Sequence, residues 1–335
     1  MYTTEKIEKA IKDTQAALRE NRQAWEKDWA KYASGILRNT ASLNTKSSKF
    51  HEWVPLHTYL TTTNAYGNPN TINFDLRYHG QNVATLICND SGTRISTKDY
   101  NQTNMHFGCE IKLDGVPWNS PAARDFRAFF RESPVRDPHA PTANEEHRIE
   151  SLLLTEFAKN GLFKIYRGIQ PVQIAGARFP MPTPIAAARH GVVRFVGPGG
   201  GGIDILARIG AGGRRHLCII ELKDEYIPRE PPSHAIEQAV KYAVFIRELL
   251  RSKAGENWWN LFRFKSPVHT PLVLFAACAM PMPNSPNTAD TSFAGDEYCI
   301  GGDDKIQLHY IYFKEKAGGN AIANIYTSLP GGLRL

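Results

Sequence analysis

The sequence predicts an α/β protein, and three features carry that prediction. Residues 203–223 form two apolar runs joined by a glycine-rich turn, which is typical of a β-hairpin because glycine accepts the positive φ of a tight connection. Residues 144–157 and 234–251 have the apolar periodicity of amphipathic helices. Residues 271–278 form a continuous apolar run, as expected of a buried strand. Helices and strands therefore alternate along this half of the chain.

The two helices carry polar side chains at informative positions. In the first, Glu146 and Glu150 lie along the same stripe as the apolar residues. The second follows two prolines and a serine suited to an N-cap. Gln238 and Tyr242 are four residues apart in it and share a face, with Lys241 beside them. These side chains are candidates for a common site.

The first part of the chain has a different pattern. Residues 4–33 read as a long amphipathic helix, for which we consider a dimerisation arm, a DNA-facing helix and simple packing on its own domain. A polar linker is expected at residues 39–49. Strand patterns separated by turns follow at residues 53–59, 71–78, 83–88 and 105–113, which predicts a small antiparallel sheet or barrel. A late edge strand is expected at residues 307–314.

Prolines at positions 134, 138 and 141 mark the best domain boundary. We therefore expect an N-terminal helix and β-rich domain at residues 1–132, and a second domain at residues 143–335. The length of 335 residues is sufficient for two cores. The second domain contains all the candidate residues described below.

Composition narrows the class of partner and compartment. The net charge of +7 favours a polyanionic partner such as DNA, because neutralising phosphates releases condensed counterions. Five cysteines without paired spacing argue against a zinc cluster or a disulfide framework. The N-terminus lacks a signal-peptide pattern and no apolar run approaches membrane-spanning length, so we expect a cytoplasmic protein without membrane contact.

Three charged residues interrupt the two apolar runs, residues 203–207 and 217–223, and are the main functional candidates. Asp204 lies near the start of the first strand, and Glu221 and Lys223 share a face at the end of the second because strand side chains alternate. Burying these charges without partners would cost roughly several kcal/mol of folding free energy. Mg²⁺, with Mn²⁺ as a substitute, takes hard oxygen ligands from one or two carboxylates, and Lys223 could orient or deprotonate a water. The alternative is a salt-bridged strand end without chemistry.

Two other segments offer competing interpretations. Glu110, Ile111 and Lys112, with Asp90 earlier in the chain, repeat the spacing loosely, but Asp90 falls in a turn and not in an apolar strand. The glycine-rich run 197–202 lacks the lysine of a P-loop and leads into a strand, so a nucleotide site is not expected there. It is either a loop that lets a phosphodiester backbone approach Asp204 or a plain surface loop.

The order of these features resembles the PD-(D/E)XK nuclease superfamily over about residues 143–280. The shared features are a helix with glutamate, an aspartate on a strand, Glu221-Leu222-Lys223 on the next, a helix with Gln238 and Tyr242, and a final strand. The proline that precedes the aspartate in the family's motif is replaced by Ile203. The resemblance implies a restriction-endonuclease-like core, a central mixed sheet flanked by helices, which here follows the N-terminal helix and antiparallel β domain.

The resemblance also implies roles for individual residues. Catalytic roles fall on Asp204, Glu221, Lys223 and Glu150, and metal binding on Asp204, Glu221, Glu150 and the carbonyl of Leu222. Contacts with the nucleic-acid backbone fall on Gln238 and Tyr242. From their positions in the sequence, Lys241, Arg189 and Arg194 are further candidates to face the substrate.

The function expected from the sequence is Mg²⁺-dependent hydrolysis of DNA phosphodiester bonds, in restriction or phage defence by analogy with the family. The N-terminal domain would supply target recognition or oligomerisation, such as a homodimer. The alternative is a catalytically inactive nucleic-acid-binding or scaffold protein that keeps the fold.

Overall fold

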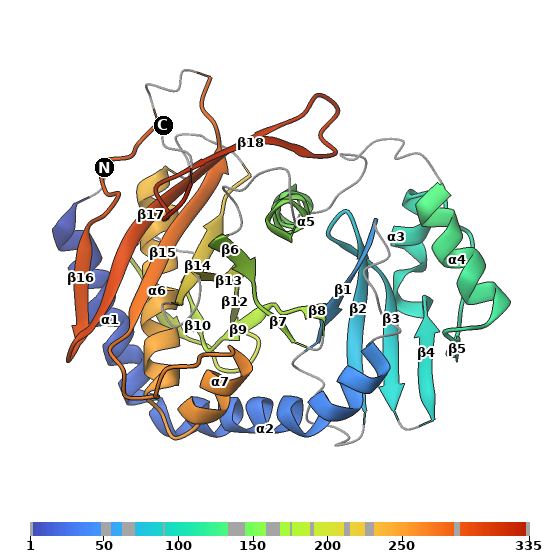
Figure 1. Ribbon diagram of the computed structural model, residues 1–335, viewed down its shortest axis with the longest axis horizontal. Coiled ribbons are helices and arrows are strands. Elements are labelled where there is room, and N and C mark those ends of the chain that lie inside the picture. The colour runs from blue at the N-terminus through green and yellow to red at the C-terminus, as the bar shows by residue number, and fades with distance from the viewer. Residues whose placement is uncertain are drawn as a thin grey trace.

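The computed structural model describes residues 3–47, 55–61, 71–89, 91–132, 145–158, 168–174, 176–187, 191–210, 215–224, 231–284 and 289–332. The fold is mixed α/β with two large sheets, as the sequence predicts. Figure 1 shows the two sheets side by side, with one long helix, α2 (Arg22–Ser47), running beneath both and α5 (Glu145–Ala158) between them. The elements of the first and second halves of the chain are therefore closely interleaved.

The C-terminal sheet has seven strands in the order β16-β17-β15-β14-β13-β6, with β18 also paired to β17. The central strands β14, β15 and β17 are parallel, and the remaining pairs are antiparallel. The predicted hairpin is confirmed, because β13 and β14 pair with Ile205 opposite Ile220. The bounds are β6 Ile169–Pro171, β13 Ile205–Ile209, β14 His216–Leu222, β15 Val273–Pro281, β16 Glu297–Gly301, β17 Asp304–Glu315 and β18 Ile322–Thr327.

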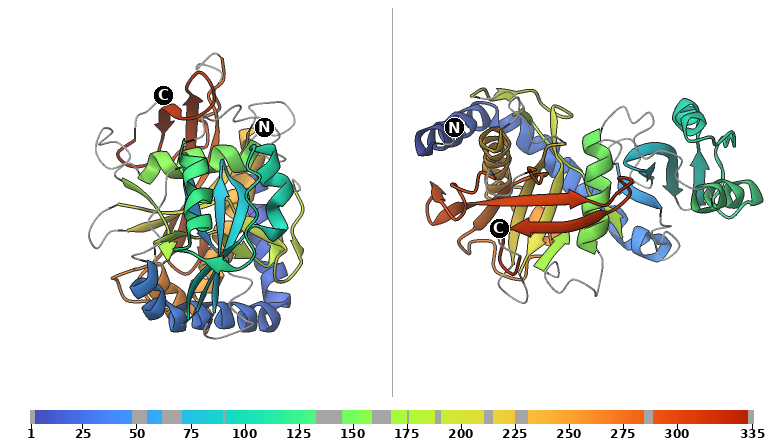
Figure 2. Two further views of the ribbon diagram at one scale, coloured as in Figure 1. Left: turned by 90° about the vertical axis from the view of Figure 1, so that its right-hand side faces the viewer. Right: turned by 90° about the horizontal axis from the view of Figure 1, so that it is seen from above.

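Helices cover both faces of this sheet. One face packs against α5, where Ile149 and Leu153 share a buried cluster with Ile205 and Ile220. The other face packs against α6 (Pro232–Leu250) and α7 (Gly255–Leu261). Apolar residues of these helices form a second buried cluster with strand residues that alternate with those of the first cluster. Seen from above in Figure 2, α5 stands between the C-terminal sheet and the N-terminal strands. The strand alternation thus decides which helix each side chain meets.

The N-terminal sheet draws strands from both halves of the chain. Its order is β5-β4-β3-β2-β1-β8-β7, antiparallel from β5 to β1, with β8 parallel to β1 through Tyr59 and Arg178. The bounds are β1 Leu56–Leu60, β2 Ile72–Tyr78, β3 Gln81–Asn89, β4 Gly92–Ser96, β5 Val116–Pro117, β7 Gln173–Ile174 and β8 Ala177–Arg178. Conversely, the N-terminal helix α1 (Thr4–Glu20) packs against α6, which belongs to the C-terminal half of the chain. The domain boundary at residues 133–142 stays a prediction, and its residues lie outside the described part.

Short elements complete the chain. Near the N-terminal sheet are a 3-10 turn, η2 (Lys98–Tyr100), and the helices α3 (Asn101–His106) and α4 (Pro121–Glu132). Two small strand pairs lie before β13, formed by β10 (Ile185–Ala186) with β11 (Arg194–Phe195) and by β9 (Met181–Thr183) with β12 (Gly201–Ile203). The glycine-rich segment 197–202 therefore ends in a paired strand.

The single N-terminal helix predicted at residues 4–33 is wrong in its length and continuity. The helix breaks at Asn21, whose side-chain amide donates to the carbonyl of Ala17, and α2 continues to Ser47 through most of the predicted linker. Trp25 and Trp29 of α2 are buried and meet Phe245 of α6 edge-on. The polarity of residues 39–47 indicated a loop, but the helix continues through them.

Two predicted strands also differ from the structure. The segment 105–113 ends a helix and continues without strand pairing, and the strand lies earlier at β4. The strand expected at an edge, β17, is interior, because β15 borders one side while β16 and β18 pair on the other. Its alternation of polar and apolar residues suggested an edge, but His309 and Asp304 are buried with hydrogen-bond partners.

The turn between β2 and β3 is pressed against the backbone of α5. Gly80 has φ +76, and a Cβ there would lie 2.0 Å from the carbonyl oxygen of His147. We expect Gly80→Ala to lower the free energy of unfolding by more than about 2 kcal/mol, because left-handed geometry costs a side chain about 1–2 kcal/mol and the backbone clash adds to it. Urea denaturation measures the loss.

Gly115→Ala is the matched control. Gly115 has φ +60, but no atom of the described residues lies within 4 Å of a Cβ there, so only the conformational cost applies. Equal losses in the two variants would show that the β2–β3 turn does not depend on close contact with α5.

Candidate active site

The first carboxylate is held at the end of the hairpin by the backbone. Asp204 lies between β12 and β13, just before the pairing of Ile205 with Ile220 begins. The backbone N–H of Leu222 donates to Oδ2 of Asp204 at 2.8 Å. A side chain thus replaces the next bond of the ladder, which places Asp204 beside the last residues of β14.

The other two charges join it there. Glu221 and Lys223 point to the α6 face of the sheet, and Nζ of Lys223 donates to Oε1 of Glu221 at 3.1 Å. The same ammonium donates to Oε1 of Glu146 at 3.3 Å. Glu221 and Lys223 are both buried, at 2% and 8% exposure. The expected convergence of Asp204, Glu221 and Lys223 is therefore present, and Glu146 of α5 takes part in it.

Burial and mutual repulsion make the carboxylates hard to ionise. Burial raises the pKa of Asp204 to about 6, the Leu222 N–H opposes that rise, and the charge of Glu146 adds to it. Burial, followed by the charge of Asp204, raises the pKa of Glu221 well above its usual range. Oε2 of Glu221 is buried and has no hydrogen-bond partner within the described residues. A cation would relieve both the repulsion and this orphaned oxygen.

Glu150 occupies a different environment from Glu146. It is 7% exposed, and burial raises its pKa to about 7 while Arg77 lowers it and Asp204 raises it. A small cavity lies between Glu150, Asp204, Tyr59 and Arg178. Glu146 thus meets the lysine directly, whereas Glu150 lies between Asp204 and the arginines.

The N-terminal sheet contributes residues that sequence reasoning missed. Arg178 of β8 donates to the hydroxyl of Tyr59 on β1 at 3.0 Å and to Oγ1 of Thr155 on α5 at 3.1 Å. The guanidinium of Arg77 on β2 lies 4.1 Å from the centre of the Tyr59 ring. No pattern in the sequence links these residues to the hairpin, because the contacts join segments far apart in the chain.

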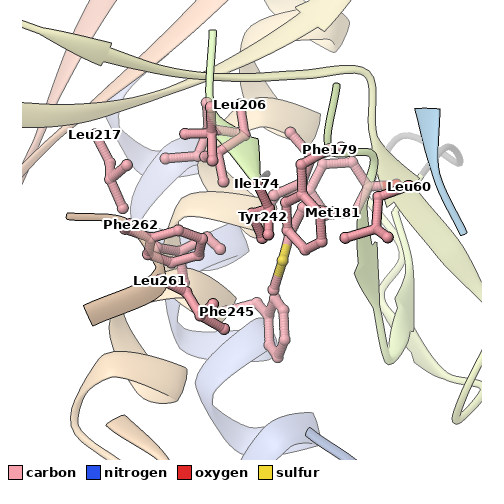
Figure 3. Packing of buried hydrophobic residues seen from close by; sticks show 14 of the residues in the cluster. Leu60, Ile174, Phe179, Met181, Leu206, Leu217, Tyr242, Phe245, Leu261 and Phe262 are labelled. Atoms are coloured by element: carbon pink, nitrogen blue, oxygen red, sulfur yellow. The ribbon is translucent and has the colours of Figure 1, made fainter. Parts of the chain in front are cut away.

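The helix residues expected to contact nucleic acid have mixed positions. Tyr242 and Gln238 are 3% and 8% exposed and hydrogen-bonded to each other, and burial followed by the charge of Glu221 raises the pKa of Tyr242. Figure 3 shows Tyr242 among Ile174, Phe179, Met181 and Leu206. Tyr242 borders the carboxylates, and Gln238 reaches them only through Tyr242.

Lys241 does not face the candidate site's carboxylates. It is 1% exposed, its Nζ lies 2.7 Å from Oε1 of Glu237, and it also donates to the carbonyls of Ala187 and Val192. Its charge is compensated within the fold, so a contact with the nucleic-acid backbone at this position would require these bonds to break.

The remaining candidates are peripheral. Arg194 is exposed on β11, and Arg189 lies outside the described residues. In the earlier copy of the motif, Glu110 and Lys112 are exposed and not on a strand, and Asp90 also lies outside the described residues. Gly201 borders the site, since a Cβ there would lie 2.6 Å from the carbonyl of Ile185 and 3.3 Å from the Tyr242 hydroxyl.

The fit to a divalent metal ion rests on two carboxylates. Among the described residues, no group of three or more Asp, Glu, His or Cys side chains stands ready to hold an ion. Asp204 and Glu221 are sufficient for Mg²⁺, which takes one or two carboxylates and keeps waters. The Leu222 carbonyl leaves the strand on the same edge as its N–H, which faces Asp204. The orphaned oxygen of Glu221 agrees with this set.

Comparison with family models, curated proteins and solved structures finds no match for this chain. The class is therefore defined by its own geometry, a mixed α/β protein with a buried carboxylate–lysine cluster between two sheets. Within the described parts, no helix has both the length and the apolar character needed to cross a bilayer. The five cysteines form no disulfide there, and four of them are buried.

Proposed function

We propose that this protein is a Mg²⁺-dependent nuclease that hydrolyses DNA phosphodiester bonds. The observation that carries the proposal is the bond from the Leu222 N–H to Asp204, which brings two carboxylates and the Lys223 ammonium to one strand end. Such a set binds a hard cation and a phosphate together, because the carboxylates hold the metal and the ammonium offsets phosphate charge.

Each residue has a role in this proposal. Asp204 and Glu221, with the Leu222 carbonyl, would hold Mg²⁺, which when bound polarises the phosphate and lowers the pKa of a water. Lys223 lies 3.1 Å from Glu221 and would orient or deprotonate that water. Glu150 would complete the site from α5, and Gln238 and Tyr242 would position the strand from α6. Metal binding would break the Lys223–Glu221 bond and free the ammonium for this task.

The order of elements supports the restriction-endonuclease-like core. Helix α5 comes first, then Asp204 directly before β13, β14 with Glu221, α6 with Gln238 and Tyr242, and β15 parallel to β14. A role in restriction or phage defence, a cytoplasmic location and a homodimer extend this proposal by analogy. The N-terminal sheet would then supply target recognition.

The alternative is an inactive protein that binds nucleic acid or serves as a scaffold. One observation favours it: Glu221 and Tyr242 are 2% and 3% exposed, so a strand would need the surrounding segments to move. Cleavage itself separates the two proposals, because binding alone breaks no phosphodiester bond.

The deciding experiment is cleavage of plasmid and single-stranded DNA with Mg²⁺ or Mn²⁺, with RNA as a further substrate. We expect cleavage by the wild type, none in EDTA, and none by Glu221→Ala. Glu110→Ala is the matched control, since it removes the glutamate of the earlier Glu-x-Lys motif, which is exposed. Full activity is expected in that variant.

Two outcomes would contradict the proposal. Absence of cleavage on every substrate and metal would favour the inactive binder. Activity that survives Glu221→Ala but disappears in Glu110→Ala would move the site to the N-terminal half.

A further inference from the structure

Three arginines gather at the end of the β13–β14 hairpin that is remote from the carboxylates. Arg208 lies on β13 opposite Leu217, and Arg215 precedes β14 by one residue and shares the Leu217 face. Arg263 follows α7, where its φ of 57 turns the chain. All three therefore lie on the side of the sheet that α6 and α7 cover.

The positive charges of this cluster are not balanced within the described residues. Arg208 is 9% exposed, and Nε of Arg208 and of Arg215 is buried without a hydrogen-bond partner there. Burial lowers the pKa of Arg208, and the charges of Arg263 and Arg215 lower it further. Like charges around buried, unsatisfied N–H groups destabilise the protein unless an anion completes the cluster.

A phosphate group has the chemistry that this cluster lacks. The planar guanidinium donates two parallel bonds to a phosphate, which carries several acceptor oxygens and a negative charge. We propose that Arg208, Arg215 and Arg263 form a binding site for the phosphate groups of a nucleic-acid strand. Arg263 is exposed and gives the strand access, while Arg208 is buried and Arg215 half-buried beside it, with Nε groups that have no partner among the described residues.

The overall charge favours a strand over a small phosphate compound. The net charge of +7 attracts polyanions from a distance, and a strand offers successive phosphates to three guanidiniums. Arg208 lies four residues beyond Asp204, about 13 Å at roughly 3.3 Å per strand residue. Leu206 is buried between them in the core, so the cluster is separate from the carboxylate site.

The site does not require the proposed hydrolysis, because binding at the arginines involves neither carboxylate. A protein that binds DNA without cleaving it would still use this arginine site. A nuclease that contacts DNA elsewhere would not use it. Binding measured without metal therefore tests this inference independently of the proposed function.

The experiment measures binding of the full chain to short labelled single-stranded and duplex oligonucleotides in EDTA, by fluorescence anisotropy over a range of salt concentrations. Compared with the wild type, Arg263→Gln and Arg208→Gln are each expected to raise Kd severalfold and to reduce the slope of log Kd against log salt by about 1. Lys305→Gln removes one exposed positive charge from β17 and should leave the slope unchanged. Because Arg263 is exposed, its variant remains a valid test even if Arg208→Gln fails to fold.

A second arm identifies the source of the phosphate. The melting temperatures of the wild type and of Arg263→Gln are measured in inorganic phosphate and in chloride at equal ionic strength. Unchanged Kd and slope in both arginine variants would overturn the proposal. If phosphate then stabilised the wild type but not Arg263→Gln, the cluster would belong to a free phosphate compound and not to a strand.

Discussion

Replacing Lys223 with methionine is expected to slow DNA cleavage by about 10²- to 10⁴-fold, the range typical of losing one acid–base group. The ammonium lies 3.1 Å from Glu221 and 3.3 Å from Glu146. Unlike the carboxylates of Asp204 and Glu221, it would act on a water and not on the metal. Methionine keeps a similar length and volume without the charge. Cleavage rate at saturating Mg²⁺ is the measurement.

Metal binding distinguishes this role from a structural one. Lys223→Met removes a positive charge beside the two carboxylates, so the affinity for Mn²⁺, measured by calorimetry, should be equal to or higher than that of the wild type. Lys112→Met makes the same change in the earlier, exposed motif and should cleave at the wild-type rate. Loss of both metal binding and cleavage in Lys223→Met would mean that the lysine only supports the fold of the site.

The second large effect concerns stability and pH. Glu150→Gln should make the metal-free protein more stable than the wild type at pH 8 by about 3 kcal/mol, at 1.36 kcal/mol per pH unit of raised pKa. The pKa of Glu150 rises from 4.5 to about 7, mainly through burial. The folded state therefore holds its proton more tightly than the unfolded state, and wild-type stability falls as pH rises between these values.

Urea denaturation in EDTA at pH 4 and pH 8 measures this difference. At pH 4 the wild-type side chain is mostly protonated in both states, so the advantage of the variant should nearly vanish. Glu256→Gln, on the exposed surface of α7, controls for the removal of one carboxylate. An equal difference at both pH values would show that Glu150 is not held in a buried, charge-repelling position.

Sequence reasoning reached the parts of the fold that depend on local pattern. The hairpin, α5, α6 and the buried strand β15 follow from apolar periodicity, which acts within a few residues. The N-cap predicted for α6 was wrong, because the helix begins at Pro232 and Ser233 lies inside it without capping the backbone. Glu221 and Lys223 share a face because side chains alternate in any strand, and glycine-rich turns return the chain so that Asp204 comes beside them. The sequence alone therefore predicts that Asp204, Glu221 and Lys223 lie close together.

Other features could not be found in this way. Lys241 looked like a partner of Gln238 and Tyr242, but it is paired with Glu237, because the neighbours packed around a buried helix determine which groups each side chain meets. The predicted edge strand became interior when β16 and β18 both paired with it. Polarity along one segment does not reveal which neighbours will cover it.

The sequence by itself determined the hairpin, α5, α6 and β15, and the positions of Asp204, Glu221 and Lys223 in the hairpin, since hydrophobic period and residue spacing are local properties. Only the tertiary structure decided that Glu146 meets Lys223, that Arg178 reaches Tyr59 across 119 positions, and that Arg208, Arg215 and Arg263 gather without a counter-charge among the described residues. Such contacts arise when separate elements bury their apolar faces together, and the resulting charge environment depends on three-dimensional distance, which the order of residues does not specify.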